Sequence, residues 1–200
     1  MNTDKHNLLA GGSDTGRALR SSTWWSVVGL SSVLWVLAGC NLPTPQADTV
    51  RHFTLSDATA GVAAPNAVLV RPVRLAGHLR NRDMAVRVSE NEIVYLEEVR
   101  WAEPLDEAIT QVLRNRLRQV GGGAIITVQI QRCEVVRNQD NTVQLTATYS
   151  IAPTSGEPRT GAFAATARKW DGKDYGALVA LLHESIAELA ETVAQAAGQK

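Results

Sequence analysis

The stretch that decides the fold is PLDEAITQVLRNRLRQVGGG, residues 104–123. Its large apolar residues recur at spacings of three and four, which places them on one face of a helix: Leu105, Ile109, Val112, Leu113, Leu117 and Val120. Pro104 suits the first helical turn, where no N–H donor is needed, and Gly121, Gly122 and Gly123 can adopt the backbone conformations that end a helix. The stretch therefore predicts an amphipathic helix that must cover a second apolar layer.

A second helix of about 24 residues is expected at the end of the chain, after Lys173. Its apolar side carries Leu178, Leu181, Leu182, Ile186, Leu189, Val193 and Ala197. This repeat again follows the helical period and not the alternation typical of a strand. The sequence thus predicts two long amphipathic helices.

The remaining segments have the pattern of strands separated by polar or glycine- and proline-containing turns. Val68, Val70 and Pro72 are expected on one face, and because proline cannot donate to a sheet, Pro72 indicates an edge position or a strand end. Residues 79–83 are expected to form a turn. The predicted strands are 50–55, 67–75, 84–89, 92–96, 124–136, 142–152 and 160–169. The order β-β-β-β-α-β-β-β-α predicts an α+β fold, a mostly antiparallel sheet with both helices packed on one face.

Residues 1–39 have the features of a lipoprotein signal peptide. Fifteen largely apolar residues, 24–38, follow the basic side chains of the leader, and this run is shorter than the roughly 20 residues of a membrane-spanning helix. It ends in Leu37-Ala38-Gly39-Cys40, which resembles a bacterial lipobox. We expect acyl chains such as palmitate on the Cys40 thiol and cleavage before it; an uncleaved membrane anchor is the alternative.

Residues 40–49 comprise the lipidated cysteine and a tether with two prolines, and residues 50–200 form the folded domain. Asn41 replaces the Asp that commonly retains lipoproteins in the inner membrane. The sequence therefore favours the periplasmic face of the outer membrane.

Composition argues against several classes of function. Twenty Lys and Arg balance twenty Asp and Glu, so nucleic acid is not an expected partner. Two cysteines cannot build a disulfide scaffold or a four-cysteine zinc site. We expect Cys133 to be a buried structural thiol, with a catalytic or intermolecular role as the alternative.

No spacing typical of a catalytic or metal site occurs in the sequence. His52, His78 and His183 lie in no metal-binding pattern, and no G-x-S-x-G motif is present. Arg114 and Arg118 share a helix face, for which a solvated surface is expected and a partner contact is the alternative. We therefore expect no enzyme, no cofactor and no metal.

The strongest candidates for a structural or partner-contact role are Trp101, Pro104 and Leu105. They lie in Arg-Trp-Ala-Glu-Pro-Leu, residues 100–105, directly before the first helix. A large aromatic side chain there can act as a hydrophobic lid that fixes the start of the helix, and a partner or lipid contact is the alternative.

Two segments carry a family resemblance: Val68 to Arg82, and Arg100 to Leu105 leading into an amphipathic helix, together with Phe53-Thr54-Leu55. They resemble the ABC-type transport auxiliary lipoprotein component family, which includes the lipoprotein subunit of the paraquat-inducible (Pqi) transport system. The resemblance implies a non-catalytic partner of a mammalian-cell-entry (MCE) domain protein and of ABC inner-membrane components.

Such systems move lipids or other hydrophobic molecules between the two membranes and maintain membrane integrity, and the resemblance allows assembly as a homo-oligomeric ring. Two other functions stay open from the residues: a lipid-anchored periplasmic hydrolase, and a purely structural envelope lipoprotein.

Overall fold

A computed structural model describes residues 49–55, 62–137 and 140–198. The chain divides into two units, Met1–Ala47 and Asp48–Lys200, and every helix and strand below belongs to the second. The predicted signal peptide, the lipobox with Cys40 and most of the tether lie outside the described residues. The described part combines helices with a mixed sheet, so the α+β class predicted from the sequence is confirmed.

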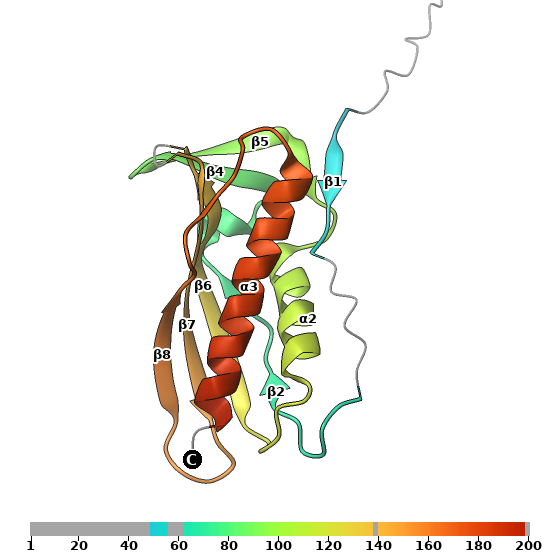
Figure 1. The fold of residues 1–200 in the computed structure, drawn as a ribbon, viewed down its shortest axis with the longest axis vertical. Coiled ribbons are helices and arrows are strands. Elements are labelled where there is room, and N and C mark those ends of the chain that lie inside the picture. Colours follow the sequence, from blue (N-terminus) through green and yellow to red (C-terminus); the bar gives the residue numbers. More distant parts are fainter. Residues whose placement is uncertain (1–48, 56–61, 138–139, 199–200) are drawn as a thin grey trace, which may run out of the picture. The chain divides into compact units, whose positions relative to one another are not determined.

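The order of the helices and strands along the chain largely follows the one predicted from the sequence (Figure 1). The helices are α2 (Leu105–Leu117), α3 (Tyr175–Gly198) and the short 3₁₀ helix η1 (Gly77–Arg80). The strands are β1 (Arg51–Phe53), β2 (Leu69–Val70), β3 (Arg74–Leu75), β4 (Asp83–Ser89), β5 (Glu92–Trp101), β6 (Ile125–Val136), β7 (Thr142–Ala152), β8 (Arg159–Ala164) and β9 (Arg168–Lys169).

The sheet has the strand order β1-β5-β4-β6-β7-β8. The pairs β4–β5, β6–β7, β7–β8 and β7–β9 are antiparallel, whereas β1–β5, β2–β6, β3–β6 and β4–β6 are parallel. Because β7 occupies one edge of β6 along its whole length, β2, β3 and β4 must follow one another along the other edge. The 3₁₀ helix η1 is an excursion of the chain between β3 and β4.

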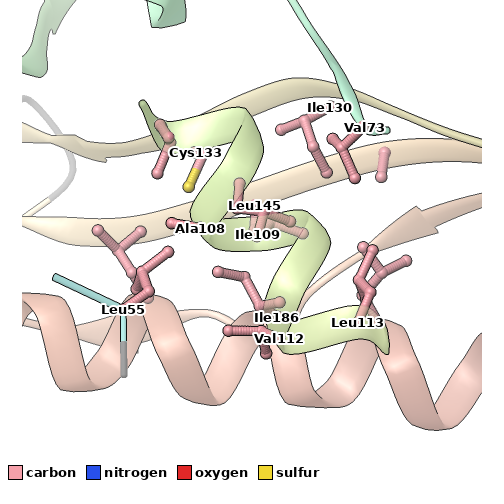
Figure 2. Packing of buried hydrophobic residues seen from close by; sticks show 14 of the residues in the cluster. Leu55, Val73, Ala108, Ile109, Val112, Leu113, Ile130, Cys133, Leu145 and Ile186 are labelled. Atoms are coloured by element: carbon pink, nitrogen blue, oxygen red, sulfur yellow. The ribbon is translucent and has the colours of Figure 1, made fainter. Parts of the chain in front are cut away.

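Helices α2 and α3 lie side by side and pack against each other (Figure 1), and Figure 2 shows the buried side chains around α2. Ile109 of α2 lies near Leu145 of β7, and Val112 lies near Ile186 of α3; all four side chains are at most 1% exposed. Helix α3 also contacts β7 and β8. Within the described residues, no helix has both the length and the apolar character needed to cross a membrane.

Several predicted boundaries are wrong. Strand β5 continues to Trp101, whereas the predicted strand ends at residue 96. Helix α2 ends at Leu117, so Val120 lies beyond the helix, although it stays half-buried and its N–H still bonds to the Leu117 carbonyl. The predicted strand 67–75 is two short strands, and the predicted strand 160–169 is β8 and β9.

The prediction that Pro72 shares a face with Val68 and Val70 is also wrong. Pro72 is exposed, and Val73 and Leu75 continue the buried face instead. Val70 pairs with Ile126 but Arg74 pairs with Gln129, so one extra residue lies between the strands and reverses the alternation.

Candidate functional site

The three residues singled out at the junction between β5 and α2 have different environments. Trp101 ends β5 and is 4% exposed. Its backbone N–H donates to the Arg82 carbonyl oxygen over 2.8 Å. Leu105, the first residue of α2, is equally buried, whereas Pro104 between them is exposed. The two apolar side chains thus pack into the core, and Pro104 faces the surface.

A pocket of about 340 Å³ opens beside this junction. Buried Val73, Leu75 and Leu105 contribute its apolar part. Its polar part consists of exposed Arg74, Arg80, Asn81 and Arg82 together with half-buried Glu103 and Asp106. Because the lining comes from β3, η1 and the start of α2, segments far apart in the sequence create this pocket.

The first strand of the domain is attached next to the pocket. Phe53 pairs with Trp101, and the Ala102 N–H donates to the Phe53 carbonyl oxygen over 2.8 Å. The Thr54 hydroxyl donates to Glu103 Oε1 over 2.6 Å. Thr54, in the segment that follows the tether, thus contacts a residue that lines the pocket.

A buried ionic cluster around Glu134 was missed by the sequence analysis. The Glu134 side chain is fully buried on β6, where its Oε1 accepts a hydrogen bond from Arg87 Nε over 2.5 Å and its Oε2 lies 3.1 Å from His78 Nε2. The Tyr95 hydroxyl donates to the His78 carbonyl oxygen over 3.0 Å. These contacts attach η1 to β4, β5 and β6, and both carboxylate oxygens of Glu134 are engaged.

Cys133, next to Glu134, is buried on the side of β6 that faces α2 (Figure 2). Burial first, and the nearby Glu134 carboxylate second, raise the pKa of the Cys133 thiol to about 12. A thiol with this pKa is protonated at neutral pH and is a poor nucleophile. The buried thiol therefore matches the structural role expected from the sequence.

The three histidines of the domain lie apart, on β1, η1 and α3. His52 is exposed, His78 belongs to the Glu134 cluster, and His183 is half-buried. Within the described ranges, no three or more His, Cys, Asp and Glu side chains are placed so that they could hold a metal ion.

Arg114 of α2 is exposed but is not merely solvated. Its Nε donates to the Val70 carbonyl oxygen over 3.2 Å and so links the helix to β2. Gly122 and Gly123 have φ values of +102° and +67°, which L side chains rarely adopt. These glycines turn the chain from the end of α2 into β6, so they belong to the fold.

Comparisons with known proteins give one family and several related folds. A model of a family described as "ABC-type transport auxiliary lipoprotein component" matches residues 53–194. A search of curated protein sequences found no match.

Two crystal structures have a similar fold. One is of an uncharacterised protein, with 16% identity, a TM-score of 0.59 and coverage of 72% of this chain and 95% of that one. The other is of a protein from Xanthomonas campestris, with 16% identity, a TM-score of 0.57 and coverage of 74% and 91%. At this level of identity the similarity shows a shared fold alone.

Proposed function

The chain belongs to the ABC-type transport auxiliary lipoprotein component family, and on this basis we propose that it is a non-catalytic accessory subunit of an MCE-type, ABC-driven system that transports lipids between the membranes of the cell envelope. In this proposal the chain is anchored through Cys40 to the periplasmic face of the outer membrane. It works by binding an MCE-domain protein and not by turning over a substrate.

The observation that carries this proposal is the position of the family match. It spans residues 53–194, from β1 to the last turns of α3, and the sequence before it contains Leu37-Ala38-Gly39-Cys40. A domain of this family directly after a lipobox and a short tether is the arrangement that a membrane-tethered accessory subunit requires.

The buried chemistry of the domain supports a binding role. Cys133 is protonated at neutral pH because its pKa is raised to about 12. Glu134 is closed off from solvent and engaged by Arg87 and His78. Both of these side chains thus serve the packing of the sheet.

Tethering also suits weak docking contacts. A lipid anchor confines the domain to one membrane face, which raises its effective concentration near a partner in the same envelope. Several identical subunits, for example in a ring, add their individually weak contacts. We therefore propose that affinity depends on the anchor and on the number of subunits.

The proposal is tested by isolating the lipidated protein from its native membrane and identifying the proteins that co-purify with it. We expect the MCE-domain protein and the ABC components to co-purify with the wild-type chain. Labelling cells with a fatty-acid analogue should mark the wild type and not Cys40→Ala. Failure of the MCE-domain protein to co-purify with a correctly labelled wild type would refute the proposed partner, and equal labelling of both chains would refute the anchor.

A further inference from the structure

Three arginines line the pocket at the start of α2 without a side-chain partner. In the described part of the chain, the guanidinium groups of Arg74, Arg80 and Arg82 make neither a hydrogen bond nor an ion pair. By contrast, Arg87 and Arg100 close by pair with Glu134 and Asp83. Like charges gathered around one pocket repel one another, so an arrangement without internal partners favours an external anion.

The acidic residues of the pocket do not cancel this charge. Glu103 and Asp106 stand against three arginines, which leaves the lining with one excess positive charge. Glu103 also accepts a hydrogen bond from the Thr54 hydroxyl, and Asp106 lies in the first turn of α2, a position that favours an acidic side chain. The arginines are thus the groups left to bind a ligand.

The chemistry of the lining points to a phosphate group. Guanidinium groups bind phosphate through paired, charge-assisted hydrogen bonds, while the apolar part of the pocket, from Val73, Leu75 and Leu105, suits a short carbon fragment next to the phosphate. The volume of about 340 Å³ is near the lower end of the roughly 300–1,000 Å³ of small-molecule sites. This space fits a headgroup better than a pair of acyl chains.

We propose that this pocket binds the phosphate of an anionic glycerophospholipid headgroup. The recognition of phosphate follows from the pocket alone, whereas the choice of a lipid as its source rests on the proposed function, in which Cys40 holds the domain at a membrane. Thr54, only a few residues beyond the tether, contacts the pocket residue Glu103. In the proposed function, the short stretch of sequence between Cys40 and Thr54 therefore favours a membrane lipid as the source of the phosphate.

The test uses the full-length lipidated protein in a neutral detergent and calorimetric titration with glycerophosphoglycerol, the headgroup of phosphatidylglycerol without its acyl chains. We expect binding that weakens at least about tenfold, equivalent to about 1.4 kcal/mol, in the double variant Arg80→Gln/Arg82→Gln. Arg71→Gln is the matched control, because Arg71 is exposed just before β3 but does not line the pocket. This control should bind as the wild type does.

Inorganic phosphate and an oligo-aspartate peptide are titrated in parallel. Tighter binding of inorganic phosphate than of glycerophosphoglycerol would overturn the lipid source. Binding of the peptide alone, or equal binding of glycerophosphoglycerol by the wild type and a folded double variant, would overturn the phosphate site itself. Because none of these titrations involves an MCE-domain protein, their outcome is separate from that of the co-purification.

Discussion

The backbone N–H of Val73 donates a hydrogen bond to the side-chain oxygen of Thr110 on helix α2, over 2.9 Å. Val73 lies where the one-residue insertion between β2 and β3 interrupts the pairing with β6. The Thr110 hydroxyl donates in turn to the Asp106 carbonyl oxygen over 2.6 Å. A helix side chain thus replaces the strand as the partner of a buried N–H.

Removing this hydroxyl should leave the Val73 N–H buried without a partner. We expect Thr110→Val to lower the free energy of unfolding by about 1–3 kcal/mol, the cost of an unsatisfied buried polar group. Thr110→Ser keeps the hydroxyl and should be affected less. Chemical denaturation checks this, and equal losses for the two variants would show that the hydroxyl contributes nothing.

A similar arrangement occurs where β8 and β9 pair with β7. Ala164 pairs with Thr146 but Arg168 pairs with Val143, so one extra residue again lies between β8 and β9. The N–H of Thr166 in this insertion donates to Glu188 of α3 over 3.2 Å. In each case, therefore, a helix side chain accepts a hydrogen bond from a backbone N–H at the point where the sheet is interrupted.

These two insertions explain which parts of the fold the sequence could predict. The helical repeats and the polar turns depend on local spacing, and they placed α2, α3 and the long strands near their observed positions. Pro72 was assigned to the wrong face because its environment depends on a hydrogen bond between Val73 and Thr110, 37 residues apart. The alternation of apolar and polar residues along a strand cannot predict a contact between residues so far apart in the sequence.

We expect Trp101 to contribute to the stability of the fold and not primarily to partner binding. Its ring is 4% exposed, so Trp101→Ala should cost about 3–5 kcal/mol through lost burial and a cavity. Trp101→Phe, which keeps an aromatic ring, should cost less. Thermal unfolding measures both variants; an unchanged melting temperature with lost partner binding would make Trp101 an interface residue instead.

The Glu134 cluster predicts that the stability of the domain depends strongly on the ion pair between Glu134 and Arg87. Glu134→Gln leaves the largely buried Arg87 without its counter-charge, which we expect to cost about 3–5 kcal/mol. Replacing both partners, in Glu134→Leu/Arg87→Met, should restore much of the stability. Denaturation of the two variants decides the point, since a double variant no more stable than Glu134→Gln would show that the ion pair is not the source of the loss.

Cys133 predicts a change of stability at alkaline pH. Burial raises the pKa of the folded thiol to about 12 from an ordinary value of 9.0. Between these values the unfolded chain loses its proton while the folded chain keeps it, so this group's contribution is complete below pH 9 and is lost progressively toward pH 12. Cys133→Ala should therefore lose less stability than the wild type between about pH 8 and pH 10.5; parallel pH profiles would contradict this.

The candidate site was predictable only in part. Pro104 and Leu105 attract attention in the sequence because they begin a helix, and both line the pocket. Glu134 gave no signal, because a single Glu in an alternating strand is normally on the solvent side. It is buried only because η1 and β4 bring His78 and Arg87 to it from more than 40 residues away.

The measurement that tests the central claim most directly is complementation of a strain that lacks this protein. We predict that a secreted, unlipidated form carrying Cys40→Ala fails to restore function, while His52→Ala, His183→Ala and, if they fold, His78→Ala and Cys133→Ala retain it. Normal function of the soluble form, together with loss of function in a folded variant at one of those four positions, would contradict a tethered docking role and reveal an active site.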